Sequence, residues 1–219
     1  MKVEWLIAAV FLASGASLLV YILAGLSLGW TLLALATAGV LVLLATVPRL
    51  APSRRRRVVR RLLIGAVAGL VATVAYDAVR LGLVQVGGLR LNPVEAWRLF
   101  GVALAGPEQS HTVHMVTGTA FHVTNGIAFG TAYTVALGQR GPWAGLAWAF
   151  VLEAFMVSVY PGWLNMKALD EFLSVSITGH VAYGLVLGWL ARSLLRSSRW
   201  GEDDRDPATD TVARVGPDR

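Results

Sequence analysis

The chain of 219 residues contains no cysteine, which excludes disulfide bonds, thiolate metal ligands and cysteine nucleophiles. Charge is scarce as well: charged residues make up 15% of the chain, against about 25% in a soluble domain. The sequence also lacks a Walker loop, a dinucleotide fingerprint and the nucleophile elbow of serine hydrolases, so these enzyme classes have no support. The composition of the chain is strongly apolar. Hydrophobic residues make up 56% of it and its mean hydropathy is +0.62, as expected for a membrane protein.

Long uncharged segments account for this hydropathy. Residues 5–26 and 28–47 carry no charge, and an apolar run of about 18 residues or more is typical of a membrane span. Backbone groups in lipid must hydrogen-bond to one another, so each span is expected to be a helix. We therefore predict an all-α, polytopic membrane protein with about six transmembrane helices. Their expected bounds are 5–25, 29–47, 62–83, 115–137, 143–160 and 172–192.

The distribution of basic residues predicts the orientation of these helices. Seven arginines and no acid lie in the segment 48–61, which we interpret as a loop. Segments rich in Lys and Arg remain on the cytosolic side of a membrane, so this loop and both chain termini are expected in the cytosol. The first apolar run is longer than the core of a signal peptide, which has about 7–15 residues, and no small-residue cleavage site follows it. We therefore expect a retained helix.

A run of four arginines in this segment has two interpretations. Arg54, Arg55, Arg56 and Arg57 would anchor the topology, and they would also contact anionic lipid headgroups. The net charge of +6 would by itself be compatible with nucleic-acid binding. That function needs a folded basic face, which the sequence does not supply. The expected partner is therefore the lipid bilayer, and not nucleic acid.

We expect one transmembrane domain over residues 1–200, followed by a polar tail of mixed charge at 201–219 that is predicted to be disordered and cytosolic. The domain begins with a helical hairpin at 5–47. On the outer side, an Asn-Pro pair is typical of a helix start, and apolar residues on one face follow it. This pattern predicts a short helix at 93–105 that lies in the outer interface of the membrane.

The last four predicted helices contain a repeated pattern of small residues. In two of them every fourth residue is small, and an acid continues the series: Gly65, Gly69, Thr73 and Asp77, then Gly141, Gly145, Ala149 and Glu153. The other two combine a histidine with two glycines: His122, Gly126 and Gly130, then His180, Gly184 and Gly188. Small residues four apart share a helix face and allow close packing. We therefore predict a pseudo-two-fold hairpin repeat, with units at 62–137 and 143–192.

Each ionisable residue in this pattern continues a stripe of small residues. It is therefore expected to face protein, because lipid would make its charge costly. At about 1.5 Å per residue, the four positions fall at similar heights, near the middle or in the outer half of the membrane. We predict one buried cluster that consists of Asp77, Glu153, His122 and His180. Two further histidines, His111 and His114, share a helix face with it, and we interpret them as a relay leading inward from the outer surface.

Four interpretations of this cluster remain open. Two imidazoles and two carboxylates would bind a transition metal such as zinc, iron, manganese or copper, although the Glu-x-x-His pairs of di-iron bundles are absent. One histidine on each of two helices would hold haem b. Buried acids and histidines also relay protons or bind substrates in transporters. In the fourth interpretation, these residues only hydrogen-bond across helices, with Asp77 paired to Arg80, and fix the packing of the bundle.

The last third of the chain contains four short motifs: Glu153-Ala154-Phe155, Pro161-Gly162-Trp163, Glu171-Phe172-Leu173 and Gly179-His180. In their order they resemble the YagU-like inner-membrane proteins of bacteria. The resemblance implies a helical membrane fold and a location in the bacterial cytoplasmic (inner) membrane. It implies no chemistry, because those proteins are poorly characterised.

These observations lead to one main hypothesis and two alternatives. The chain is expected to bind or conduct a cation or a proton at the Asp/Glu/His cluster, from the outer side of the membrane. Alternatively, it is a structural or accessory subunit without a ligand of its own, in a homo-oligomer or a larger membrane complex. The third hypothesis is a metal- or haem-dependent membrane oxidoreductase. Enzymatic activity is the less favoured expectation.

Overall fold

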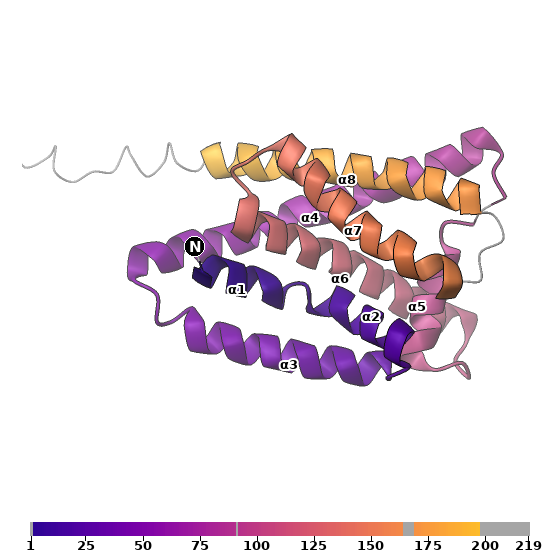
Figure 1. The fold of residues 1–219 in the computed structure, drawn as a ribbon, viewed down its shortest axis with the longest axis horizontal. Coiled ribbons are helices and arrows are strands. Elements are labelled where there is room, and N and C mark those ends of the chain that lie inside the picture. Colours follow the sequence, from indigo (N-terminus) through magenta and orange to yellow (C-terminus); the bar gives the residue numbers. More distant parts are fainter. Residues whose placement is uncertain (1, 91, 164–168, 198–219) are drawn as a thin grey trace, which may run out of the picture.

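The computed structural model describes residues 2–90, 92–163 and 169–197. Within these residues the chain forms eight helices and no strand, which confirms the predicted all-α class (Figure 1). The helices are α1 (Lys2–Val10), α2 (Ala13–Ala24), α3 (Leu28–Thr46), α4 (Pro52–Gly87), α5 (Glu95–Ala105), α6 (His111–Leu137), α7 (Pro142–Trp163) and α8 (Leu169–Ser197). The tail at 201–219, predicted to be disordered, lies outside the described residues.

Four helices, α3, α4, α7 and α8, are long and apolar enough to cross a membrane, and the bent pair of α1 and α2 adds a fifth if it forms one span. These helices are consistent with a membrane protein. The α6 helix is not among them, although it runs beside them along the long axis of the molecule (Figure 1). It packs against α1, α4 and α5, so much of its surface contacts protein and does not need lipid-compatible side chains. Length and composition thus support four or five of the six predicted spans.

Several helix bounds differ from the predicted ones, and three of the differences change the interpretation of the sequence. The α4 helix begins at Pro52, so the whole run of four arginines lies in its first turns and not in a loop. Proline is favourable at the first helical position, where its missing N–H would have no intrahelical partner. The α7 helix continues through Pro161 to Trp163, beyond the predicted end at residue 160. The first predicted span is broken at residues 11–12, where α1 and α2 meet with a bend of 55°.

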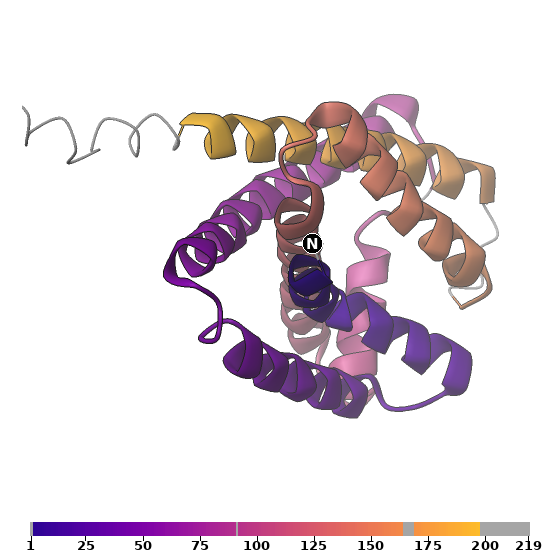
Figure 2. The ribbon, with the colours of Figure 1, turned by 60° about the vertical axis from the view of Figure 1, so that its left-hand side comes forward.

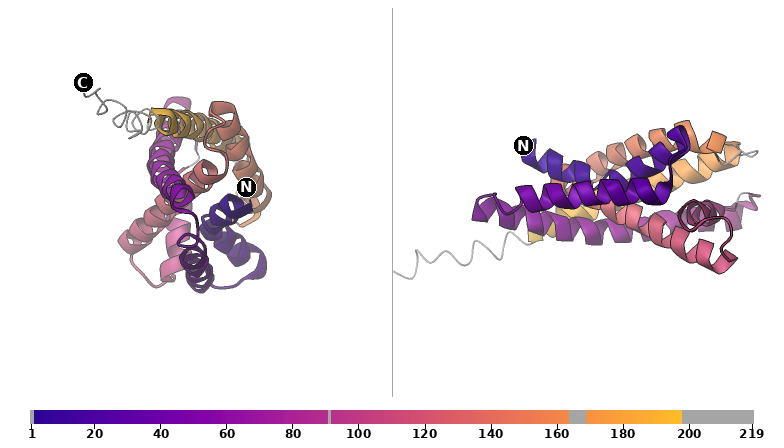
Figure 3. Two further views of the ribbon diagram at one scale, coloured as in Figure 1. Left: turned by 90° about the vertical axis from the view of Figure 1, so that its left-hand side faces the viewer. Right: turned by 90° about the horizontal axis from the view of Figure 1, so that it is seen from below.

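Most of the basic residues in the described part of the chain lie at one end of the molecule, whereas Arg80, Arg90 and Arg98 lie toward the other. The start of α1, the α3–α4 connection, the α6–α7 connection and the end of α8 lie at this end, and α5 and the α2–α3 connection lie at the other (Figure 1). The arginine run of α4 is therefore at the same end as Arg140, Arg192 and Arg196. Helices α1, α2 and α3 form a separate hairpin that packs on the side of α6 away from α8 (Figures 2 and 3).

Glycine stripes bring α4 against α6 and α7 against α8. A Cβ atom built on Gly69 of α4 would lie 2.7 Å from the carbonyl oxygen of Gly126 on α6. A Cβ atom built on Gly145 of α7 would lie 2.8 Å from the Cα atom of Gly188 on α8. Real Cβ atoms do not approach backbone so closely, so each helix pair packs at this separation only because these residues are glycine.

The two helix pairs are joined by the packing of α4 against α8. At this contact, a Cβ atom built on Gly179 would lie 2.8 Å from the ring of Tyr76. The buried core surrounding it draws on α4, α6, α7 and α8, and includes Tyr133, Tyr183 and Leu187. The ionisable residues that follow the glycine stripes on these four helices are therefore held at fixed separations.

Candidate functional site

The first buried acid, Asp77 on α4, lies beside His122 on α6. The Nε2 atom of His122 is 3.1 Å from Oδ1 and 3.0 Å from Oδ2 of Asp77. Both side chains are largely buried, with exposed fractions of 16% for the histidine and 17% for the acid. One turn further along α4, Nη1 of Arg80 is 3.4 Å from Oδ1 of the same carboxylate. Asp77 therefore lies between an imidazole and a guanidinium.

The second buried acid, Glu153 on α7, lies beside His180 on α8. The Nδ1 atom of His180 is 2.7 Å from Oε2 of Glu153 and 3.0 Å from the carbonyl oxygen of Ser176. The hydroxyl of Ser176 donates a hydrogen bond of 2.9 Å to the same Oε2 atom. The other carboxylate oxygen, Oε1, is buried and has no hydrogen-bond partner among the described residues. Among the described residues, Glu153 therefore has partners at only one of its two carboxylate oxygens.

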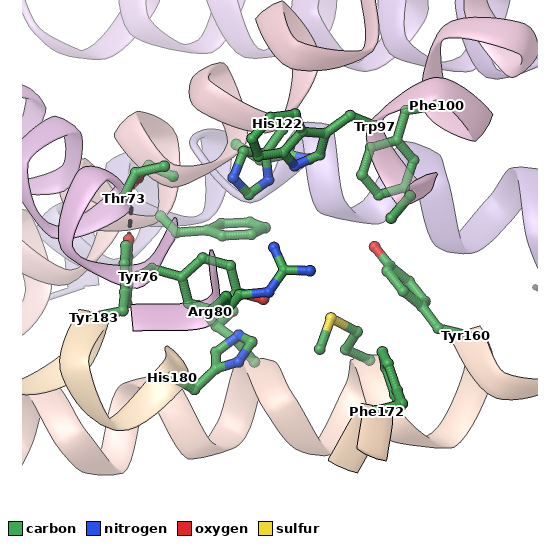
Figure 4. Close-up of a pocket in the computed structure, with 16 residues that line it drawn as sticks. Thr73, Tyr76, Arg80, Trp97, Phe100, His122, Tyr160, Phe172, His180 and Tyr183 are labelled. Carbon is green, nitrogen blue, oxygen red and sulfur yellow. Dashed lines mark hydrogen bonds between the residues drawn. The ribbon is translucent and has the colours of Figure 1, made fainter. Parts of the chain in front are cut away.

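The ring of Tyr76 lies between the two acid–histidine pairs (Figure 4). Its centroid is 6.0 Å from that of His122 and 4.9 Å from that of His180. The guanidinium carbon of Arg80 is 4.8 Å from the centroid of the same ring, at a distance typical of a cation–π contact. The predicted cluster of four ionisable residues is therefore present as two pairs that both contact Tyr76 through their histidines.

A cavity of about 110 Å³ lies where these side chains meet. Five helices, α4 to α8, contribute to its walls. Its polar lining includes Arg80, His122, Asn125 and His180, and its aromatic lining includes Tyr76, Trp97, Phe100, Tyr160 and Phe172 (Figure 4). The two acids do not line it. Each acid is therefore connected to the cavity through its histidine partner, and Asp77 also through Arg80.

The predicted metal site is not assembled as a single group. Among the described residues, no three His, Asp or Glu side chains are placed to hold one metal ion, whereas protein zinc sites use three or four such ligands. Haem b would have to lie between the rings of His122 and His180, and Tyr76 occupies that space (Figure 4). The donor groups fit neither cofactor in this arrangement.

The two histidines predicted to lead inward do not reach the cavity. His111 is exposed at the first residue of α6. His114 is buried, and its Nε2 atom is 2.9 Å from the carbonyl oxygen of Gly106, just beyond the end of α5. Nearby, a Cβ atom built on Gly101 of α5 would overlap the backbone of His114. His114 therefore contributes to the packing of α5 on α6.

Several lining residues were not selected from the sequence. Tyr76 is one of them. It lies four residues before Arg80, which the sequence predicted only as a partner of Asp77, and so it shares a face of α4 with that arginine. Trp97 and Phe100 come from α5, which lies outside the repeated pattern. No sequence signal placed α5 against the acid–histidine pairs.

Comparisons with known proteins identify the family but no function. A sequence model described as "Family of unknown function (DUF6789)" matches residues 59–199. This range contains every residue that lines the cavity, and it excludes α1, α2 and α3. No curated protein and no solved structure matches the chain. The resemblance to YagU-like proteins finds no support in these comparisons.

Proposed function

The chain belongs to the DUF6789 family of unknown function, and from its cavity we propose that it is a membrane protein that binds protons from the outer side and conducts them across the membrane by way of this cavity. Buried carboxylates beside histidines are the groups that move protons in membrane proteins. The observation that carries this proposal is that both buried acids are paired with histidines, and both histidines line one cavity.

We propose further that six segments cross the membrane, α6 among them, and that both termini are in the cytosol of a bacterium. The collection of arginines at one end of the molecule supports this orientation, because basic segments remain on the cytosolic side. The position of α6 between the other long helices supports its crossing (Figure 1). In this orientation the cavity lies toward the outer half, on the side of α5.

The proposed internal repeat would relate α4 and α6 to α7 and α8. In each pair, glycines of the first helix contact glycines of the second. In each pair, an acid of the first helix also lies within 3.0 Å of a histidine of the second. The α5 helix is then an insertion in the first unit, because α7 and α8 have no described helix between them.

The expected partner of the arginine run is the anionic surface of the bilayer. Arg55, Arg56 and Arg57 are exposed in the first turns of α4. Arg54 instead donates two hydrogen bonds to Glu4, of 2.9 and 2.7 Å, and so ties α4 to α1. We propose that the three exposed arginines contact lipid headgroups.

The proton function is tested by flux into liposomes that contain the purified protein. A potassium gradient with valinomycin drives protons inward, and an enclosed pH-sensitive dye reports the rate. We expect Asp77→Asn and Glu153→Gln each to lower the rate about tenfold or more, because an amide keeps the shape of the acid but accepts no proton. The control is Glu95→Gln, which removes a carboxylate of α5 whose partner is Arg98, at 2.6 Å. A wild-type rate equal to that of empty liposomes would refute the proposal.

A structural role is the second candidate, and one observation favours it: each acid–histidine pair connects two helices. The chain would then be an accessory subunit, alone or in a larger complex. Both hypotheses expect the two amide variants to remain folded, since an amide still bonds to a histidine and a neutral hydrogen bond contributes only about 1 kcal/mol. They differ in flux, which the structural role does not predict for the wild-type protein.

A further inference from the structure

Arg80 is a buried cation with an unused donor. Only 8% of the residue is exposed. Its Nη2 atom donates a hydrogen bond of 3.0 Å to the carbonyl oxygen of Pro93, and Nη1 is 3.4 Å from Asp77. The Nε atom has no hydrogen-bond partner among the described residues. The guanidinium projects into the space between Tyr76 and Tyr160 (Figure 4). Because buried polar groups almost always have partners, this donor indicates a missing acceptor.

Two other residues that line the same cavity also have an unpartnered polar atom. The Oδ1 atom of Asn125 is buried without a partner among the described residues, and the residue is 9% exposed. The Nε1 atom of Trp97 is also buried and unpartnered there. Asn125 can present either its oxygen or its amide nitrogen, because the side-chain amide rotates. The residues that line the cavity thus include a guanidinium, an indole and an amide, and each of them has one polar atom without a partner among the described residues.

Apart from its two histidines, most of the remaining lining of the cavity is apolar or aromatic. Phe100, Met156, Tyr160 and Phe172 line it, and the ring of Phe100 lies 6.1 Å from that of Tyr160. Binding sites for small molecules combine such walls with a few convergent polar groups. The volume suits one small ring rather than a long chain.

We infer that this cavity binds a small organic anion, whose carboxylate contacts Arg80 and whose apolar body lies among the aromatic rings. This inference rests on the proposed function, since it names what the same site takes besides a proton. A guanidinium matches the geometry of a carboxylate with paired hydrogen bonds. A cationic ligand is disfavoured, because Arg80 lines the cavity whereas both acids stand outside it with histidine partners.

The inference is tested by isothermal titration calorimetry on the full chain in detergent, with benzoate, benzamide and benzylammonium as probes. The three share one ring and differ in charge. We expect benzoate to bind at least about tenfold more tightly than benzamide, because a hydrogen bond to a charged group is stronger than a neutral one. Benzylammonium should bind more weakly than either.

Variants assign the binding to Arg80. We expect Arg80→Gln to weaken benzoate binding about tenfold or more, and Trp97→Phe, which keeps a ring but removes the indole donor, to weaken it severalfold. The matched control is Arg98→Gln on α5, whose partner Glu95 lies three residues earlier, as Asp77 does for Arg80. It should leave binding unchanged. If Arg80→Gln does not fold, the comparison of the three probes and the Trp97→Phe variant still test the anion site.

The outcomes separate this inference from the proton function. No benzoate binding, equal binding of benzoate and benzamide, or preferred binding of benzylammonium would each overturn the anion site, even if liposomes show proton flux. Preferred benzoate binding that depends on Trp97 and Arg80 supports the site. If such binding occurs without any proton flux, the proton function fails and the anion site stands, because equilibrium binding needs no proton movement.

Discussion

Two glycines of α4 should respond to alanine in opposite directions. A Cβ atom on Gly69 would lie 2.7 Å from the carbonyl oxygen of Gly126, and 3.0 Å from both the Cα atom and the carbonyl oxygen of Ile127. All three are backbone atoms, and ordinary contacts are about 3.5–4.0 Å. The α4 and α6 helices would have to separate by roughly 0.5–1 Å. A Cβ atom on Gly82 of the same helix would meet nothing within 4 Å.

The expected free energies follow from these contacts. Overpacking at Gly69 costs about 1–3 kcal/mol, and the better helix propensity of alanine offsets about 1 kcal/mol of it. Gly69→Ala should therefore lower the free energy of unfolding by up to about 2 kcal/mol. Gly82→Ala has only the propensity gain and should raise it by about 0.5–1 kcal/mol. The Gly82 variant is thus the matched control.

The assay is reversible unfolding in mixed detergent and SDS micelles, followed by far-ultraviolet circular dichroism. Both variants are compared with the wild-type protein at one protein and detergent concentration. The reasoning about helix contacts is refuted if Gly69→Ala is as stable as Gly82→Ala. A stable Gly69→Ala would mean that α4 and α6 are further apart than the glycine stripe indicates.

Three more predictions concern single contacts. Tyr133→Phe removes a buried hydroxyl that donates to the carbonyl oxygen of Gly141 at 3.0 Å, and chemical denaturation should show a loss of about 1 kcal/mol. Ser176→Ala removes the 2.9 Å hydrogen bond to Glu153, and the same assay should show a loss of about 1.5–3 kcal/mol. Gly118→Ala places a methyl group against the backbone of α5, so displacement of that helix should weaken benzoate binding about tenfold, measured by calorimetry.

The elements of the site that the sequence could predict depend on helix periodicity. A spacing of four residues places Gly69 and Asp77 on one face of α4, and Gly145 and Glu153 on one face of α7, whatever the helices contact. The helical rise per residue also predicts the positions of the two acids along the helix axes. It does not give partners, so it could not show that each acid lies beside the histidine of its neighbouring helix, with Tyr76 between the pairs.

Other features have no local signal. The bend between α1 and α2 falls on Phe11 and Leu12, and neither proline nor glycine is present there to predict it. The burial of α6 depends on contacts with α1, α4 and α5, which hydropathy cannot show. Trp97 lines the cavity only because α5 packs against the other helices, whereas the sequence of this segment predicts no more than a short helix. In each of these three cases, tertiary contacts determine the structure and local sequence does not.

The α5 helix lines the cavity without taking part in the acid–histidine pairs. It supplies Trp97 and Phe100 but neither an acid–histidine pair nor a glycine stripe. It is attached to α6 by a compact contact of Gly101 and Gly118. Mutation can therefore alter ligand preference through α5 while the four long helices keep their packing and their ionisable groups. Divergence of selectivity within such a fold would begin in this helix, because substitutions at its lining positions leave the acid–histidine pairs and the glycine stripes unchanged.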